Sequence, residues 1–151
     1  MVAKEIMTKD VQSVDPLMQI REFATFLIKK NVSGAPVVDS NGDFLGIVTE
    51  EDLIFQDKKV NLPTFLNLFS NIIPLGIART EEELRKITGT DLKDVMQENP
   101  PTISPEMSIE EIATIMSENK TYYLTVIENN KVVGVVTKRD LIKAVAKGKI
   151  W

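Results

Sequence analysis

The chain carries one sequence pattern twice. Shifting its 151 residues by 89 positions aligns ten identical residues within 38 positions, and a shift of 88 beyond Gly42 aligns six more. The phrase GIVTEEDL, which begins at Gly46, and the phrase GVVTKRDL, which begins at Gly134, are the plainest matches. Sixteen identities in 50 positions are several times the chance number, so the sequence predicts two homologous halves of about 50 residues.

Each half has the residue pattern of a β-α-β-β-α unit. In the first half, Ser13 and Val14 form a short extended piece, followed by Asp15 as the expected N-cap and Pro16 as the first residue of a helix. The second half repeats this start with the letters SP at Ser104. Apolar residues at helical spacing then define one buried face in each helix: Leu17, Ile20, Phe23, Ala24, Leu27 and Ile28 in the first, and Ile109, Ile112, Ala113 and Met116 in the second.

A β-hairpin is predicted after each helix. The letters APVVD, SNGD and FLGIV indicate a strand, a turn and a strand, and LTVIENNKVVGVV repeats that order in the second half. A unit of this size that leaves one sheet face exposed is marginal by itself. We therefore expect a mixed α+β fold, in which two β-α-β-β-α repeats pack sheet to sheet about a pseudo-twofold axis, with a cleft on each side of that axis.

The duplication divides the chain into three segments. Residues 1–56 form the first repeat, 57–90 a helical connector and 91–151 the second repeat. The connector has a helix with one apolar face over residues 63–73, and a second helix with a capping box at Thr80 and Glu83. The apolar face either packs on its own module or contacts a second subunit or a partner protein.

Composition excludes most catalytic chemistry. The chain has no cysteine and no histidine, which removes thiolate and imidazole groups as nucleophiles, bases and metal ligands. It also lacks a Gly-x-x-x-x-Gly-Lys-Ser/Thr phosphate loop, so we expect a non-catalytic protein without a metal site. The net charge of −4 argues against binding to DNA or an anionic membrane. Without a long apolar stretch or an N-terminal signal, we expect a cytoplasmic protein.

The repeated Thr-x-x-Asp motif has two interpretations. Thr49 to Asp52 and Thr137 to Asp140 each follow a strand and open a helix. In a capping box, the hydroxyl and the carboxylate satisfy free backbone N–H groups. In a ligand site, the threonine donates to a phosphate at the helix start, and the aspartate accepts both hydroxyls of a ribose. The glycine of each phrase likewise indicates either close packing within the sheet or room for a ligand.

Together these motifs resemble a known family. The order Ser/Thr-apolar, amphipathic helix, APVVD strand, turn and GIVTEEDL, present twice, is similar to a tandem pair of cystathionine-β-synthase (CBS) domains, the Bateman module. The resemblance covers residues 4–56 and 93–146. It implies a flattened module whose clefts bind AMP, ADP, ATP, S-adenosylmethionine or NAD, with Mg²⁺ accompanying ATP and no obligatory cofactor. It also implies a homodimer that regulates a partner protein.

The resemblance assigns two binding sites, each built across the repeats. Two aspartates become ribose anchors and two threonines become phosphate or ribose donors: Asp52, Asp140, Thr49 and Thr137. The Asp140 cleft is completed by Lys138 and Arg139 and by a wall from the first repeat, namely Ser13, Val14, Ser33, Gly34, Ala35 and Pro36. The Asp52 cleft faces a wall from the second repeat, namely Thr102, Ile103, Tyr122, Tyr123 and Leu124.

The two predicted clefts differ in charge. Lys138 and Arg139 favour an anionic ligand at one motif, whereas Glu50 and Glu51 repel phosphate at the other. The SGAP wall leaves room for adenine, while TYYLT departs from the family pattern at Thr125. We therefore expect the TKRD motif to mark the main site, and the TEED cleft to be empty or to take a less charged ligand. The alternatives are a solvated helix face for the charged residues and a core or edge position for the two tyrosines.

Two functions are open from the sequence. The first is a regulatory module that binds AMP, ADP or ATP and signals to a separate protein, with S-adenosylmethionine or NAD as other ligands. The second is a dimerisation or protein-interaction module whose clefts are vestigial.

Overall fold

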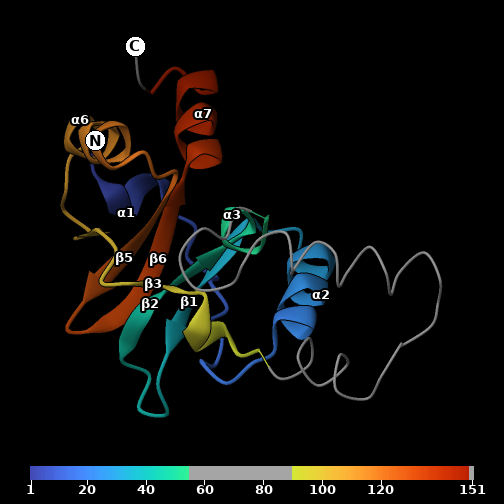
Figure 1. Cartoon of the computed structure of the whole chain (residues 1–151). Coiled ribbons are helices and arrows are strands. Elements are labelled where there is room, and N and C mark those ends of the chain that lie inside the picture. Colours follow the sequence, from blue (N-terminus) through green and yellow to red (C-terminus); the bar gives the residue numbers. More distant parts are fainter. Residues whose placement is uncertain (55–89, 150–151) are drawn as a thin grey trace, which may run out of the picture.

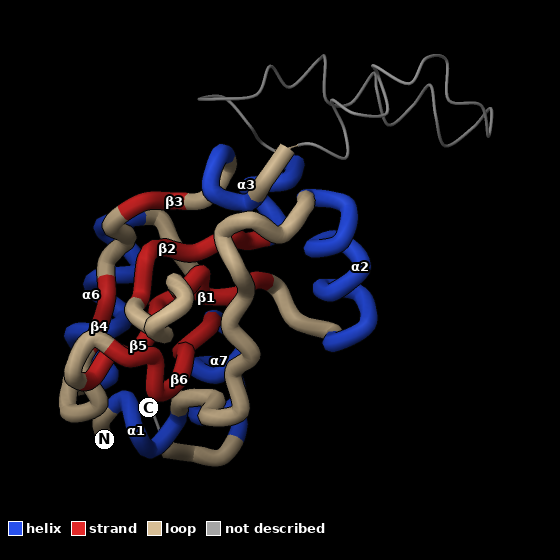
Figure 2. Tube along the Cα trace, turned by 90° about the horizontal axis from the view of Figure 1, so that it is seen from below, coloured by secondary structure: helices blue, strands red, loops and turns tan. Residues whose placement is uncertain are grey.

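The structure is a computed structural model that describes residues 1–54 and 90–149. The predicted connector helices lie outside these residues. Figure 1 shows helices α1 (Ala3–Ile6), α6 (Ile109–Asn119) and α7 (Lys138–Ala146) on one side, and α2 (Ile20–Lys30) and α3 (Glu50–Ile54) on the other. The strands of both sheets lie between these two groups, and the view from below in Figure 2 shows the same separation.

The first sheet is antiparallel, with the strand order β1-β2-β3. Its strands are β1 (Gly34–Val38), β2 (Phe44–Thr49) and β3 (Gln97–Glu98). The hairpin register pairs Gly34 with Thr49. The motif threonine therefore lies opposite the first residue of β1, at the end of the sheet where α3 begins.

The second sheet repeats this hairpin, with the strand order β4-β5-β6. Its strands are β4 (Thr102–Ile103), β5 (Tyr123–Glu128) and β6 (Lys131–Thr137); β4 is parallel to β5, and β6 is antiparallel to it. Tyr123 pairs with Thr137, as Gly34 pairs with Thr49 in the first sheet. The predicted mixed α+β fold of two repeats is confirmed.

Helices α2 and α6 begin later than the sequence predicts. Asp15 caps a turn, because its Oδ1 accepts the backbone N–H of Leu17 at 2.7 Å, and α2 begins only at Ile20. In the second repeat, Ser108 rather than Ser104 is the N-cap of its helix, and its hydroxyl accepts the N–H of residue 111. The predictions from Asp15-Pro16 and from SP at 104 were therefore wrong by several residues, since both pairs form turns ahead of the helix.

The buried faces of these helices are narrower than predicted. The residues that are buried are Ile20, Phe23, Leu27, Ile109, Ile112 and Met116. Leu17 and Ile28 are 61% and 82% exposed, and Ala113 is also exposed. Within the described residues, no helix has the length and apolarity needed to cross a bilayer.

The leading segment of each repeat packs in the core of the other repeat. Ala3 is fully buried in the second core, beside Ile103 and Leu124, and its N–H donates to the Met107 carbonyl at 2.8 Å. In return, the 3₁₀ helix η1 (Leu92–Asp94) places its first residue in the first core. The hydrophobic core of each repeat is therefore completed by the leading segment of the other repeat.

A third buried cluster lies between the two sheets. It consists of Ile47, Tyr123 and Val135, with Val11 and Phe44 packed against it. Ile47 and Val135 are equivalent positions of the two repeats, so this cluster lies at the pseudo-twofold axis. Apolar burial on both sides of the axis fixes the two motifs relative to one another.

Candidate functional site

In each Thr-x-x-Asp motif the aspartate caps the junction of a strand and a helix, and the second motif forms a full capping box. Asp140 Oδ2 accepts the N–H of Thr137 at 2.8 Å and its hydroxyl at 3.0 Å, and the same hydroxyl accepts the N–H of Asp140 at 3.4 Å. Asp52 Oδ2 accepts the N–H and the hydroxyl of Thr49 at 2.8 and 3.1 Å. The capping interpretation is thus confirmed for the TKRD motif, and the carboxylate half of the box is formed at the TEED motif. One oxygen of each carboxylate is free of the capping threonine.

A third side chain reaches each of these carboxylates. The hydroxyl of Thr8 donates to Asp140 Oδ1 at 3.1 Å, and Nε2 of Gln97 lies 3.0 Å from both oxygens of Asp52. These two residues were not among the predicted site residues. The signal that could have found them is the repeat itself, since Thr8 and Gln97 are 89 positions apart and directly follow the matched Met7 and Met96.

The glycines of the two phrases make room for the chain itself. A Cβ atom on Gly134 would lie 2.6 Å from Sδ of Met7 and 2.9 Å from the Thr8 carbonyl oxygen. A Cβ atom on Gly46 would collide with the carbonyl oxygen of Gln97. Both glycines therefore allow the segment that carries the third side chain to lie directly on the strand, which is the close-packing interpretation rather than the ligand one.

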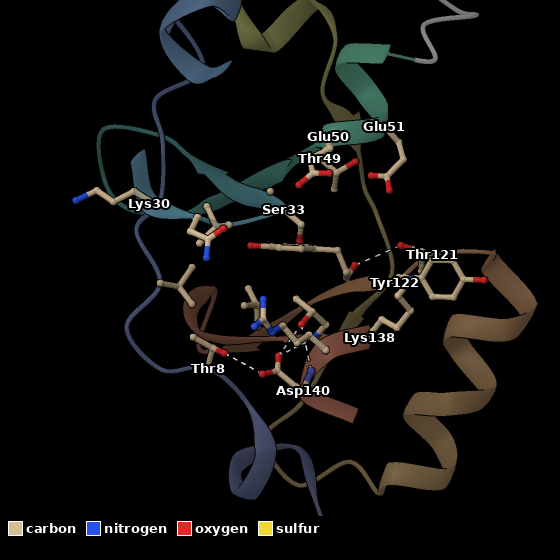
Figure 3. A pocket seen from close by; sticks show the side chains of 18 of the residues that line it. Thr8, Lys30, Ser33, Thr49, Glu50, Glu51, Thr121, Tyr122, Lys138 and Asp140 are labelled. Atoms are coloured by element: carbon tan, nitrogen blue, oxygen red, sulfur yellow. Dashed lines mark hydrogen bonds between the residues drawn. The ribbon is translucent and has the colours of Figure 1, made fainter. Parts of the chain in front are cut away.

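A cleft of about 1180 Å³ runs between the repeats. Figure 3 shows Ser33, Thr49 and Glu50 on one wall and Lys138 and Asp140 on the other. Residues of the TEED and TKRD motifs line this cleft, although Asp52 does not, and the two separate clefts stay a prediction. This geometry brings side chains of opposite charge from both repeats around one space.

The predicted site residues divide into two groups. Those that line this cleft are Ser33, Gly34, Thr49, Tyr122, Tyr123, Thr137, Lys138, Arg139 and Asp140. Those that do not are Ser13, Val14, Ala35, Pro36, Asp52, Thr102, Ile103 and Leu124. Most of the second group is buried, with Val14, Ala35, Ile103 and Leu124 in the hydrophobic cores. A contact between these residues and a ligand stays a prediction.

The electrostatics of the cleft differ between its two halves. Nζ of Lys138 lies 5.2 Å from the ring centroid of Tyr122, which is 58% exposed. Burial, and secondarily the charge of Asp140, raises the pKa of the Tyr123 phenol, which therefore stays protonated at neutral pH. Burial also raises the pKa of Asp52, although its hydrogen bonds with Thr49 and Gln97 act in the opposite direction.

The lining of the cleft carries charged and polar groups from both repeats, and its described residues show no site for a metal ion. In residues 1–54 and 90–149, no group of three or more acidic, histidine or cysteine side chains could hold a metal. The cationic groups on the lining, namely Lys30, Lys120, Lys138, Arg139 and Lys143, are suited to an anion.

Known proteins resemble the chain in sequence and in fold. An uncharacterized protein of Methanocaldococcus jannaschii is 32% identical over 158 residues, covering 95% of this chain and 90% of that protein. The crystal structure of CBSX2 in complex with AMP matches with a TM-score of 0.72 at 22% identity, covering 99% of this chain and 98% of the other. The CBS domain pair of protein MJ0100, in complex with methylthioadenosine and S-adenosylmethionine, matches with a TM-score of 0.72 at 21% identity and the same coverage.

These two structural likenesses show the shared fold, and the family follows from the sequence. The family model for the CBS domain matches residues 3–58 and again residues 92–147. The two matches coincide with the two repeats, whose sheets pack about the pseudo-twofold axis. The chain therefore belongs to the CBS domain family, with one CBS domain in each repeat.

Proposed function

We propose that this chain is a non-catalytic regulatory module that binds an adenosine-containing ligand in the cleft between its repeats. The observation that carries the proposal is the arrangement of Ser33 and Gly34 on the wall opposite Asp140. The small side chain of Ser33 on one wall leaves space for a base, and the carboxylate on the other wall accepts the hydroxyls of a ribose. The ligand would cross from one repeat to the other, so its binding would hold them in one relative position.

The chemistry of the cleft favours a phosphorylated ligand at the TKRD motif. Lys138 and Arg139 both line the cleft beside Asp140 and carry two positive charges. Arginine and lysine bind phosphate through charge-assisted hydrogen bonds, which are about twice as strong as neutral ones. AMP, ADP and ATP are therefore the proposed ligands, with Mg²⁺ carried by ATP itself.

The ligands of similar modules support this assignment. CBSX2 has been crystallised with AMP, and the MJ0100 domain pair with methylthioadenosine and S-adenosylmethionine. All three compounds contain an adenine and a ribose, while only AMP has a phosphate. The adenosine part is thus the common element, and the cationic pair is what favours AMP over the sulfur compounds here. We further propose that the module acts as a cytoplasmic homodimer that regulates a separate protein.

Thermal unfolding with added ligand tests this proposal. A ligand that binds only the folded state stabilises it by about 2.7 kcal/mol at a hundredfold excess over its Kd. We expect AMP, ADP or ATP to raise the unfolding temperature, Asp140→Ala to abolish the increase and Asp52→Ala to retain most of it. Because both aspartates also cap helices, each variant is compared with its own ligand-free unfolding temperature.

Two results would contradict the proposal. If no adenosine compound changes the unfolding temperature, the assembly function is favoured, and the mass of the particle in light scattering becomes the relevant measurement. If Asp52→Ala alone abolishes the increase, the ligand binds at the TEED motif instead.

A further inference from the structure

Positions 8 and 97 are equivalent in the two repeats but carry different side chains. Each follows a methionine, and each lies on the glycine of the strand that leads into a Thr-x-x-Asp motif. Thr8 pairs with Val135 as an isolated bridge, and Gln97 pairs with Ile47 within β3. The backbone therefore holds both side chains in the same place relative to the aspartate of the motif.

The two side chains occupy their carboxylates differently. The Thr8 hydroxyl contacts only Oδ1 of Asp140, at 3.1 Å. The amide nitrogen of Gln97 lies 3.0 Å from both oxygens of Asp52, so it competes for both with any pair of ligand hydroxyls. A hydroxyl can rotate and accept a hydrogen bond from a ligand while it stays in place, whereas the amide must leave.

The lining of the cleft reflects this difference. Asp140 and Thr8 both line it, although Asp140 is only 6% exposed. On the other side, Gln97 lines the cleft and Asp52 does not. Asp52 is more exposed than Asp140, so the contact with Gln97, and not burial, is what distinguishes the second carboxylate.

We propose that Gln97 is a built-in occupant of the second carboxylate, so that the module binds one diol ligand per chain, at Asp140. This inference rests on the proposed function, because it concerns which of the two aspartates takes the ribose. Displacing Gln97 breaks its contacts with an ionised group, and hydrogen bonds to charged groups are among the stronger ones in proteins. Thr8 permits binding because it donates to only one oxygen of Asp140 and can stay in place when a ligand binds.

Isothermal titration of the full chain with adenosine tests the inference. Adenosine has the diol but no charge, so Glu50 and Glu51 do not decide the outcome. We expect one adenosine per chain in the wild type and two in Gln97→Thr, which copies the first repeat into the second. The reverse exchange, Thr8→Gln, is expected to raise the Kd at Asp140 by at least about tenfold.

Thr8→Val is the matched control at the same position. It removes the hydroxyl while keeping the shape of the side chain, and it is expected to retain one adenosine per chain with an equal or lower Kd. If position 8 affected stability alone, Thr8→Val and Thr8→Gln would change the Kd for adenosine in the same direction. Circular dichroism and the ligand-free unfolding temperature establish that each variant is folded.

The results separate this inference from the proposed function. Two adenosines per wild-type chain, or one in both the wild type and Gln97→Thr, would overturn the role of Gln97 and leave adenosine binding intact. A wild-type Kd in Thr8→Gln would overturn it as well. If neither the wild type nor Gln97→Thr binds adenosine or AMP, the proposed function itself has failed.

Discussion

The two repeats share a backbone plan but surround the same motif with different side chains. In both, a strand ends at a threonine, a helix begins, and the aspartate three residues later accepts the threonine N–H at 2.8 Å. The first motif is surrounded by Glu50, Glu51 and Gln97, and the second by Lys138, Arg139 and Thr8. Gln97 and Thr8 each come from the leading segment of the other repeat. The difference teaches that the cap is common to both repeats, and that the side chains around the carboxylate are what distinguish them.

The opposite walls extend the same contrast. Ser33 and Gly34 in the first repeat correspond to Tyr122 and Tyr123 in the second. Tyr123 is buried in the cluster between the sheets, and Tyr122 carries the Lys138 ammonium on its ring. Gly34 is packed closely against Val48 and Thr49 of its own hairpin, whereas its counterpart Tyr123 places an aromatic ring between the sheets. The two repeats therefore share a backbone arrangement but differ in the residues of their walls.

The largest effect is expected where the exchanged segments lie on the strands. Gly46→Ala places a Cβ atom against the carbonyl of Gln97, which is backbone and cannot rotate away. Gly134→Ala meets first the flexible side chain of Met7 at 2.6 Å and then the Thr8 carbonyl at 2.9 Å. Since overpacking typically costs about 1–3 kcal/mol, we expect losses of about 3 kcal/mol for Gly46→Ala and about 2 kcal/mol for Gly134→Ala in denaturant unfolding.

The control for this pair is Gly148→Ala near the end of the described chain. No atom lies within 4 Å of a Cβ at Gly148, so only its φ of +66° opposes the substitution. A loss at Gly46 no greater than at Gly148 would show that β3 moves aside without cost.

An intermediate effect is expected from exchanging the charges of the second motif. Lys138→Glu together with Arg139→Glu gives the repeats the same acidic pair. We expect the Kd for AMP to rise by about tenfold or more, about 1.4 kcal/mol, with a smaller change for adenosine, because only the phosphate senses the reversed charge. Titration of both ligands against the same variant measures the difference. Equal changes for AMP and adenosine would mean that the cationic pair does not contact phosphate.

Much of this comparison could be predicted from the sequence. The repeat, the two hairpins and the strand-to-helix position of both motifs follow from identities and periodicity. The late start of α2 was not predictable from Asp15-Pro16, because the same letters suit a turn and a helix start. Thr8 and Gln97 were missed for a different reason, since they reach the aspartates only through the exchange of leading segments. That exchange depends on packing between residues far apart in the chain.

The smallest effect concerns the response of the first motif to acid. Burial raises the pKa of Asp52 above its value in the unfolded chain, so the folded protein binds this proton more tightly than the unfolded chain does. The contribution of Asp52 to the free energy of unfolding therefore increases as the pH falls through the folded pKa, and it is complete below about 3.8. Relative to Asp52→Asn, the wild type should gain stability on acidification from neutral pH. Gln97→Leu should move this gain to higher pH, because it removes hydrogen bonds that lower the pKa.

Glu111 provides a control of opposite sign within the second repeat. Hydrogen bonds from the backbone and side chain of Ser108 lower the pKa of this exposed carboxyl below 4.5. Its stabilising contribution is present above that pH and is lost as the pH falls through the folded pKa. Urea unfolding of Asp52→Asn and Glu111→Gln between neutral pH and about pH 3 should thus give differences from the wild type that change in opposite directions. If the differences of both variants from the wild type change in the same direction, the hydrogen bonds of Asp52 lower its pKa by more than burial raises it. Gln97 would then be stabilising the carboxylate rather than only covering it.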